Sequence, residues 1–451
     1  MRLVRQRYHI FFFVSMVVRK VAGEQGCRAP NLLRLTIGDD GAMTLLSKTY
    51  GLRHCHNEKA EPQQPYGPRQ RQVLNLEAFE RARAEISSWP GYDETPLHDL
   101  KGLAAAAGVA RLWYKDEAGR FGLGSFKALG GAYAVQRILI EQIEGETGTK
   151  EVTPGDLLAG TYREITDRVT VTCATDGNHG RSVAWGAQRF GCRCVIYIHA
   201  GVSDGRKQAI ERYGATIVRT AGNYDDSVRQ AAADAAAEGR VVVSDTSYPG
   251  YMEIPRHVMQ GYTIMADEAL RQHGTADLPT HIFIPGGVGG FAAAVCAHYW
   301  ESLQDRRPRM VVVEPEQAAC ILETVRAGRP TAVHGDLETI MAGLACGEVS
   351  LLAWEVLEQG LDDVLTVPDA AAAECMRLLA RGIGGDPRIV AGESATAGLA
   401  GLLIALADPQ SASALGLGPE SRVLLFGSEG ATDAAVYQEI VGQSPEEVAA
   451  G

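Results

Sequence analysis

The hydrophobic pattern of the chain changes at about residue 168. From there onward, short apolar runs rich in β-branched residues alternate with longer, alanine-rich segments. The runs are continuous rather than alternating, which is typical of strands buried on both faces. They predict strands at 168–175, 193–199, 215–219, 240–244, 281–285, 309–314, 363–367 and 422–427. The intervening segments predict helices at 181–190, 227–238, 254–270 and 370–381, with another beginning near Phe291.

Alternation of strands and helices predicts an α/β protein with open, mostly parallel sheets wrapped by helices. In such sheets, ligands bind where the strands end at their carboxyl side. Functional residues are therefore expected in the turns that follow the predicted strands.

A single lysine, Lys127, lies in the glycine-rich segment 116–132, just before the sequence Gly-Gly-Ala. Small neighbours let a flat ring approach the backbone, and an amine in such a place can form a Schiff base with an aldehyde cofactor. Burial is expected to lower the pKa of this lysine and free its lone pair. A surface lysine at the start of a helix is the alternative for this segment taken alone.

The predicted strand 281–285 leads into a turn suited to an anion, made of Gly286, Gly287, Val288, Gly289 and Gly290. Four glycines at a strand-to-helix turn let backbone N–H groups converge on a phosphate, with the helix dipole behind them. The dinucleotide pattern GxGxxG is not met, because Ala292 takes the third glycine position. A tight turn without a ligand is the alternative.

The residues around Lys127 also carry a family resemblance. Ser-Phe-Lys followed by Gly-Gly-Ala is similar to the cofactor lysine of pyridoxal-phosphate (PLP) enzymes of the tryptophan synthase β family, also called fold type II. The string Lys-Asp-Glu-x-x-Arg-Phe-Gly-Leu-x-x-Phe-Lys-x-Leu-Gly-Gly-Ala-Tyr-Ala resembles the diaminopropionate ammonia-lyases, a branch of the threonine and serine dehydratase group. A second string, Asp-Thr-x-x-x-Gly-Tyr-x-x-Ile-Pro-x-x-x-Met-Gln-Gly-Tyr-x-x-x-Ala-Asp-Glu, begins at Asp245 and resembles the same family. The similarity runs from about residue 78 to about residue 438.

This resemblance implies two α/β lobes, a homodimer, and PLP in the cleft between the lobes. A small lobe of residues 129–250 would be inserted into a large lobe made of 73–128 and 251–451. Ser428 would place a hydroxyl at the pyridine nitrogen of the cofactor, with Thr432 as a nearby competitor. The expected cofactor-binding residues are Phe126, Lys127, Asn178, Gly286, Gly287, Val288, Gly289, Gly290 and Ser428.

The turn after the predicted strand 168–175 resembles the Gly-Asn-His loop of the family, whose N–H groups hold the substrate carboxylate. The expected substrate-binding residues are Thr175, Asp176, Gly177, His179 and, from a later turn, Asp245. Dehydratases of the group commonly carry a small residue in place of Asp176. A carboxylate there could hold a second substrate ammonium, or remove a proton from the face opposite Lys127. The alternatives are a helix N-cap for Asp176 and a strand-end turn residue for Asp245.

The resemblance implies α,β-elimination of 2,3-diaminopropionate to pyruvate and two molecules of ammonia. Lys127, Asp176 and Asp245 would be the catalytic residues. Lys127 would remove the Cα proton of the L-isomer and Asp176 that of the D-isomer, while Asp245 faces the departing amine. One alternative is a dehydratase of the same superfamily acting on threonine, serine or hydroxyaspartate, which two carboxylates in the site disfavour. Another is a catalytically silent PLP-binding protein.

Charge and cysteine content narrow the range of partners. A formal net charge of −12 argues against nucleic acid as the main partner, since no basic excess neutralises phosphates. The nine cysteines show no CxxC spacing and the histidines no HExxH, so no metal site is predicted. Free thiols and a cytoplasmic location are expected, and pairing of Cys320 with Cys346 stays open.

The first 72 residues fall outside the resemblance and are predicted to be a poorly ordered extension. Its segment 58–72 is rich in proline, glutamine and charge, which is typical of a linker. The apolar run 10–18 is too short to span a bilayer, so no membrane association is expected, and a targeting segment is the alternative. Residues 144–162 are predicted to be an insertion.

Overall fold

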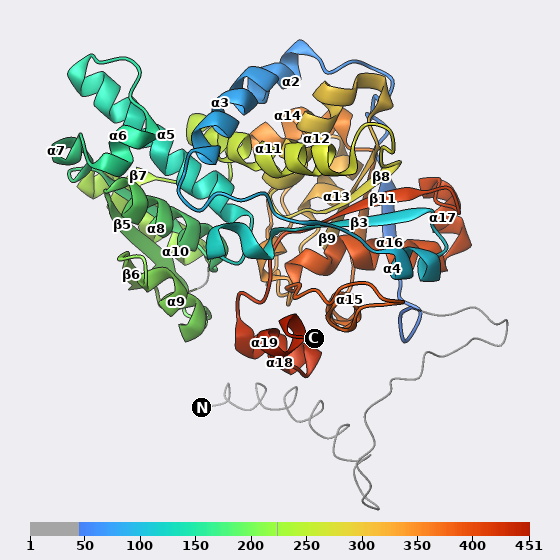
Figure 1. The fold of residues 1–451 in the computed structure, drawn as a ribbon. Coiled ribbons are helices and arrows are strands. Elements are labelled where there is room, and N and C mark those ends of the chain that lie inside the picture. Colours follow the sequence, from blue (N-terminus) through green and yellow to red (C-terminus); the bar gives the residue numbers. More distant parts are fainter. Residues whose placement is uncertain (1–44, 223) are drawn as a thin grey trace, which may run out of the picture. The chain divides into compact units, whose positions relative to one another are not determined.

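The computed structural model of the protein describes residues 45–222 and 224–451. The run 10–18, with its targeting alternative, lies outside these residues. The described chain folds around two sheets of mostly parallel strands wrapped by helices, as the hydrophobic pattern predicted (Figure 1). Within the same residues, no helix is long and apolar enough to cross a membrane.

The larger sheet has seven strands in the order β1-β10-β9-β8-β11-β3-β2. Its strands are β1 (Arg53–His56), β2 (Leu97–Asp99), β3 (Arg111–Asp116), β8 (His281–Pro285), β9 (Arg309–Pro315), β10 (Asp363–Val367) and β11 (Arg422–Gly427). The inner strands run parallel to one another, whereas β1 and β2 are antiparallel strands at the two edges. Every residue of β8 is buried, which explains why its sequence shows no polar alternation.

The smaller sheet is fully parallel and has the order β6-β5-β4-β7. Its strands are β4 (Thr170–Ala174), β5 (Arg193–Ile198), β6 (Thr216–Arg219) and β7 (Val241–Val242). All four lie inside the segment 129–250 that was expected to form the small lobe. The boundaries of the lobes themselves stay a prediction.

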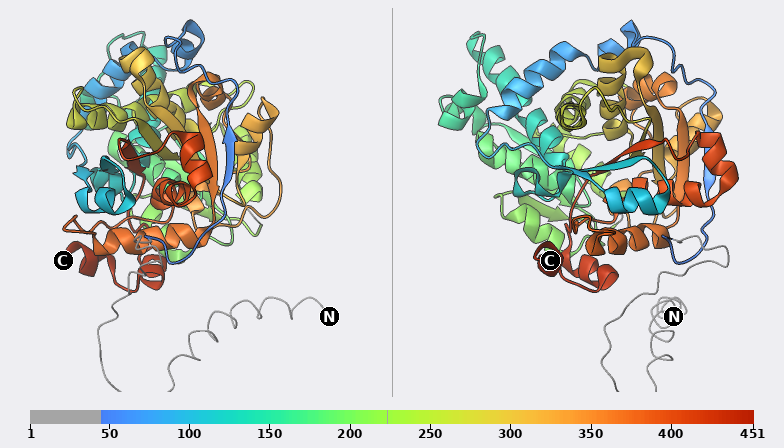
Figure 2. Two further views of the ribbon diagram at one scale, coloured as in Figure 1. Left: turned by 90° about the vertical axis from the view of Figure 1, so that its right-hand side faces the viewer. Right: turned by 45° about the vertical axis from the view of Figure 1, so that its right-hand side comes forward.

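Helices cover both faces of the large sheet and surround the small one (Figures 1 and 2). Along the small-lobe segment they are α5 (Lys127–Thr147), α6 (Pro154–Ala159), α7 (Arg163–Thr166), α8 (Asn178–Phe190), α9 (Asp204–Glu211) and α10 (Tyr224–Glu238). Elsewhere they are α2 (Pro68–Val73), α3 (Leu76–Ser87), α4 (Lys101–Ala107), α11 (Glu253–His273), α12 (Gly290–Leu303), α13 (Cys320–Ala327), α14 (Leu351–Gly360), α15 (Asp369–Arg381), α16 (Ala397–Ala407), α17 (Pro409–Leu415), α18 (Ala434–Val441) and α19 (Pro445–Ala449). Four helices were predicted with a first and a last residue. They lie within α8, α10, α11 and α15 and are confirmed.

The core continues from one sheet to the other. On β11, Leu424 and Phe426 belong to one hydrophobic cluster, while Val423 and Leu425 belong to a second cluster on the opposite face. The first cluster also contains Val171 of the small sheet. One shared core therefore supports the ends of strands from both sheets.

The prediction that residues 1–72 lie outside the fold is wrong for their described part. β1 pairs with β10 as an edge strand of the large sheet, and α2 begins inside the predicted linker. β1 is polar and half-exposed, so it has no apolar run that would reveal it. Polar contacts attach it instead: His54 and His56 both contact the buried carboxylate of Asp363, at 2.8 and 3.1 Å.

Candidate active site

Lys127 is the first residue of α5, at the end of a loop fastened to the turn that follows β11. The N–H of Gly430 donates to the carbonyl of Gly124 at 2.9 Å, and the N–H of Phe126 donates to the carbonyl of Ser428 at 3.1 Å. Gly124 has a φ of 77°, a conformation that glycine adopts without strain. The glycine-rich approach therefore sets the lysine against the carboxyl end of β11.

The Gly-Gly sequence after Lys127 serves close helix packing. A Cβ atom on Gly130 would lie 2.4 Å from Tyr262 of α11, and one on Gly131 would lie 1.9 Å from Ser182 of α8. Both distances are far below van der Waals contact, so only glycine fits at either position. The helix that carries Lys127 is thus held between a helix of each lobe.

The lysine is paired with a carboxylate from the turn after β7. Its Nζ lies 2.6 Å from Oδ2 of Asp245, and less than a fifth of the lysine side chain is exposed. Burial lowers the pKa of a lysine, but the charge of Asp245 and its hydrogen bond to Nζ outweigh that effect, so the pKa of Lys127 is raised. The expectation that burial lowers this pKa is therefore wrong. The sequence expectation misses the effect of Asp245, which lies 118 residues from Lys127 along the chain.

His179 lies beneath this pair rather than open to the cleft. Its Nε2 contacts the carbonyl oxygen of Val243 at 2.8 Å, and its Nδ1 lies 4.0 Å from Oδ2 of Asp245. The ring therefore packs the first turn of α8 against the backbone that leads to Asp245. Burial lowers the pKa of His179, which keeps the ring neutral.

The glycine turn between β8 and α12 has the shape of an anion cradle. Gly287 and Gly289 have φ values of 64° and 88°, and Gly290 begins α12. The first N–H groups of a helix have no partner within the helix, so they are available to a phosphate. The ring of Phe291, in the first turn of α12, stacks on Phe126 with a centroid distance of 4.4 Å. This contact sets the cradle beside Lys127, as a PLP phosphate requires.

Asn178 is held on both sides of its amide. The Nη2 of Arg181, one turn along α8, donates to its Oδ1 at 2.5 Å, and its Nδ2 donates to Glu429. One N–H of the amide is left to face a cofactor ring. Ser428, next to Glu429, is 5% exposed at the end of β11.

Sequence reasoning missed Arg181 and Glu429. In the sequence, Arg181 could have been noticed only because it lies one helical turn after Asn178. Glu429 could have been noticed only because it follows Ser428.

Asp176 is not the N-cap of α8. Gly177 occupies the N-cap position, and the hydroxyl of Thr175 accepts hydrogen bonds from the N–H groups of Gly177 and Gly180, both at 3.0 Å. The carboxylate of Asp176 instead lies 2.8 Å from Nε2 of His199. The N-cap alternative for Asp176 is therefore wrong, and its carboxylate is free of any role in the helix.

The charges of the three predicted catalytic residues all act on one thiol. Burial and the charge of Asp245 raise the pKa of Cys346 to about 12, with Lys127 and Asp176 acting on the same group. Desolvation and the charges of Asp176 and Asp245 also raise the pKa of Tyr224, at the start of α10, although 41% of this residue is exposed. Sequence reasoning missed this tyrosine, since nothing in its surroundings marks it. Cys346 and Cys320, whose pairing was left open, are both free thiols.

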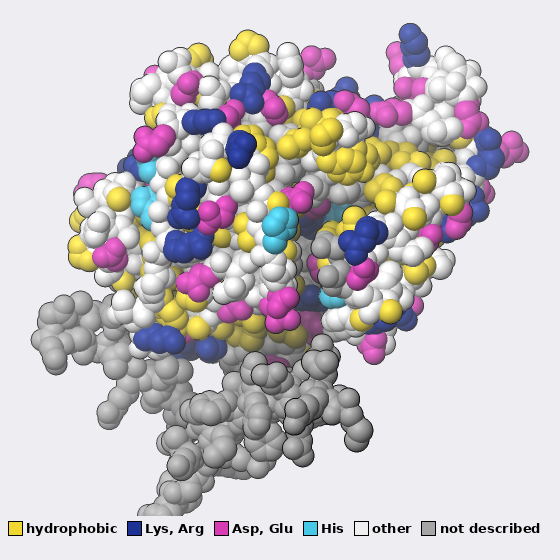
Figure 3. Space-filling model, turned by 180° about the vertical axis from the view of Figure 1, so that it is seen from behind, with side chains coloured by type: hydrophobic (Ala, Val, Ile, Leu, Met, Phe, Trp, Pro, Cys, Tyr) yellow, Lys and Arg dark blue, Asp and Glu magenta, His cyan; other side chains and the backbone are white. Residues whose placement is uncertain are grey.

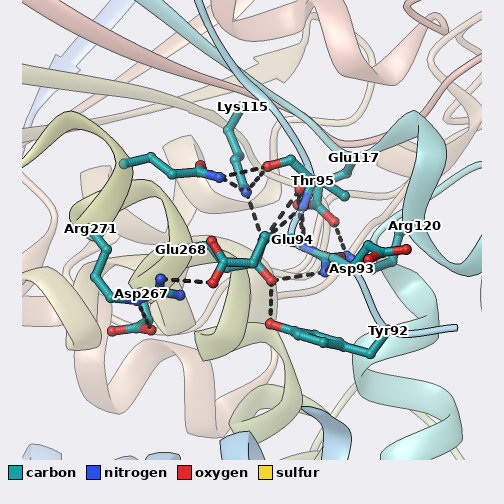
Figure 4. Close-up of polar contacts among 11 residues, drawn as sticks. Tyr92, Asp93, Glu94, Thr95, Lys115, Glu117, Arg120, Asp267, Glu268 and Arg271 are labelled. Carbon is teal, nitrogen blue, oxygen red and sulfur yellow. Dashed lines mark hydrogen bonds and ion pairs between the residues drawn. The ribbon is translucent and has the colours of Figure 1, made fainter. Parts of the chain in front are cut away.

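A buried charge network supports the loop from behind (Figure 4). Glu268 of α11 accepts hydrogen bonds from Lys115 at 2.7 Å, Arg120 at 2.6 Å and Tyr92 at 2.8 Å. Arg120 also pairs with Glu117 at 2.8 Å. The string Lys-Asp-Glu-x-x-Arg thus contributes paired charges that fix the chain before Lys127.

A buried lysine, a glycine cradle for phosphate, and an amide and a hydroxyl between two α/β lobes together define a PLP-dependent enzyme. The family described as "Pyridoxal-phosphate dependent enzyme" matches residues 89–427 of the chain. Diaminopropionate ammonia-lyase of Escherichia coli K12 is 39% identical over 363 residues, which is 80% of this chain and 90% of the relative. The Salmonella typhimurium protein of that name is 40% identical over 379 residues, 82% of this chain and 93% of the relative. The chain belongs to the diaminopropionate ammonia-lyase family of PLP-dependent enzymes.

Solved structures agree with this membership. Holo diaminopropionate ammonia-lyase from Escherichia coli has a TM-score of 0.80 at 36% identity, over 87% of this chain and 97% of that one. Threonine deaminase isoform 2 from Solanum lycopersicum has a TM-score of 0.64 at 19% identity, over 86% of this chain and 98% of that one, and shares the fold alone.

Proposed function

We propose that this chain uses PLP to convert 2,3-diaminopropionate to pyruvate and two molecules of ammonia by α,β-elimination. One observation carries the proposal beyond family membership: Asp245 already binds an ammonium group in the cleft, that of Lys127, at 2.6 Å. Diaminopropionate differs from serine in carrying a second ammonium. A carboxylate placed to bind such a group selects for it.

The residues of the site fit the cofactor. Lys127 would bind its aldehyde, the turn 286–290 its phosphate, Asn178 its ring oxygen and Ser428 its ring nitrogen, while Phe126 packs beside the lysine. When bound, PLP supplies the aldehyde that takes up the substrate amine and the conjugated ring that accepts electrons from Cα. A hydroxyl such as that of Ser428 hydrogen-bonds a neutral ring nitrogen, so the ring remains a moderate electron acceptor.

Two groups of this chain would take the Cα proton. Lys127 would remove it from the L-isomer, and Asp176 from the D-isomer on the opposite face. Asp245 would hold the β-ammonium until the bond to Cβ breaks and ammonia leaves. The N–H groups of Thr175 and Gly177 already donate to Tyr197 and to the Thr175 hydroxyl, so those of Asp176, Asn178 and His179 would orient the substrate carboxylate.

The second reading is a dehydratase acting on threonine, serine or hydroxyaspartate. The carboxylates of Asp176 and Asp245 disfavour it, because they repel an anionic β-substituent and leave a hydroxyl without a cationic partner. A silent PLP-binding protein would be recognised by cofactor absorbance without turnover.

The stoichiometry of the products tests the proposal. With diaminopropionate, the PLP-loaded protein should release two ammonia molecules for each pyruvate, whereas a hydroxyamino acid yields one. Lys127→Ala should lose both the absorbance of the bound cofactor and the release of pyruvate. Full activity in Lys127→Ala, or turnover of hydroxyamino acids only, would refute the proposal.

A cytoplasmic homodimer stays part of the proposal. Hydrophobic side chains gather in a patch on the upper right part of the face opposite to that of Figure 1 (Figure 3). Exposed apolar patches mark interaction surfaces, which supports self-association. Sedimentation of the purified protein measures it.

A further inference from the structure

His199 and Asp176 are brought together by the register of two neighbouring strands. β4 and β5 are parallel, and Ala174 is the partner of Tyr197. Each of the two residues follows its strand partner by two positions, so both side chains leave the same edge of the sheet. There, Nε2 of His199 lies 2.8 Å from Oδ1 of Asp176.

The tautomer of His199 is fixed by its other nitrogen. The N–H of Gly201 donates to Nδ1 at 3.1 Å, so Nδ1 is the acceptor and Nε2 carries the proton. Gly201 allows this approach, since a Cβ atom there would lie 2.9 Å from Cε1 of the ring. The neutral imidazole therefore donates to Asp176 without bringing a second charge to the cleft.

The contact engages one carboxylate oxygen, and the other has no hydrogen-bond partner among the described residues. The side chains of His199 and Asp176 are 25% and 31% exposed, so the pair is partly accessible from solvent. The charge of Asp176 also acts on the buried thiol of Cys346. The free oxygen, Oδ2, is the one available to a substrate.

We propose that His199 is a positioning residue that directs Oδ2 of Asp176 at the Cα proton of D-2,3-diaminopropionate. This inference rests on the proposed lyase function. The Cα–H bond breaks, the proton goes to Oδ2, and the electron pair remains with the substrate and its cofactor. His199 keeps its proton throughout, because the protonated carboxyl still accepts at Oδ1.

Turnover of the two isomers separates this role from a merely structural one. His199→Phe keeps a ring but removes the donor, and should lower kcat/KM for the D-isomer about tenfold or more, as expected for a hydrogen bond to a charged group. The L-isomer should change by no more than about twofold, since Lys127 serves it. His199→Gln keeps a donor and should recover most of the D-isomer activity.

Two further variants complete the design. His98→Phe is the matched control, because His98 is equally exposed and faces Asp116 at 3.6 Å; it should leave the ratio of D to L turnover unchanged. In an Asp176→Asn background, His199→Phe should cause no further loss with the D-isomer.

Equal losses for both isomers, or no loss for either, would overturn the inference. Wild-type protein active on the L-isomer alone would overturn it and leave the lyase function intact. Inactivity on both isomers would refute the proposed function itself.

Discussion

Asp245 presents its carboxylate to the ammonium of Lys127, and the pair is largely shielded from water. When Lys127 holds the cofactor, its amine would no longer be free to pair with Asp245, and the carboxylate could bind the second ammonium of the substrate. Asp245 would thus first pair with the charged lysine and later bind the second ammonium that distinguishes the substrate.

Asp245→Asn should shift the reaction of Lys127 with PLP to lower pH. The variant removes the charge that raises the pKa of Lys127, while burial, which lowers it, remains. The free amine then appears at lower pH. The rate at which cofactor absorbance develops, measured against pH, should show its inflection displaced to lower pH. An inflection at the wild-type position would show that Asp245 does not control the lysine.

At the scale of elements, the polar strand β1 depends on one buried carboxylate. Burial alone would raise the pKa of Asp363, but hydrogen bonds from His54, Arg309 and His56 hold it at about 2. A depressed pKa contributes stability above the unfolded value, near 4, that is lost as the pH falls through 2. The difference corresponds to about 2 kcal/mol. Wild-type protein should lose that much more unfolding free energy than Asp363→Asn between pH 5 and pH 2, by urea denaturation. Parallel losses would contradict this account.

The network behind the lysine loop joins three elements through one carboxylate (Figure 4). Glu268→Gln removes the ion-pair partner of Lys115 among the described residues and leaves Arg120 paired with Glu117 alone, and all of these side chains are buried. The free energy of unfolding should fall by about 3–5 kcal/mol, as for other broken buried pairs. The exposed pair Arg163–Asp167 provides the control, because Asp167→Asn should change it by less than about 1 kcal/mol. Comparable effects of the two substitutions would mean that the network is not what stabilises the loop.

At the scale of the whole molecule, α5 links the two lobes. It packs on α8 through Gly131 and on α11 through Gly130, and its first residue is Lys127. Any separation of these helices therefore moves the lysine relative to the phosphate cradle.

Gly131→Ala should weaken both folding and cofactor binding. The added methyl would meet the hydroxyl of Ser182, and overpacking of this kind lowers the free energy of unfolding by about 1–3 kcal/mol. Gly145→Ala on the same helix is the control, since its Cβ would meet nothing within 4 Å. Thermal unfolding and PLP titration of the two variants provide the measurement. Unchanged PLP affinity in Gly131→Ala would show that the helix contact does not position the site.

Much of this architecture could be predicted from local sequence. The continuous apolar runs revealed the buried parallel strands, and the glycine-flanked Lys127 with the turn 286–290 revealed the chemistry. What stayed hidden depends on distant pairing. β1 is polar and is recognisable only beside Asp363, and the contact of His199 with Asp176 follows from the register of β4 and β5. The raised pKa of Lys127 likewise comes from a partner that local sequence does not show.

The most direct test of the central claim is the ratio of kcat/KM for 2,3-diaminopropionate to that for L-serine, measured as pyruvate release. Wild-type protein should prefer at least one isomer of diaminopropionate, and Asp245→Asn should reduce that preference by about 30-fold or more, as expected when one partner of a charge pair is removed. A wild-type preference for L-serine or L-threonine would contradict the account. It would leave the fold and Lys127 in place but remove the roles assigned to Asp176 and Asp245.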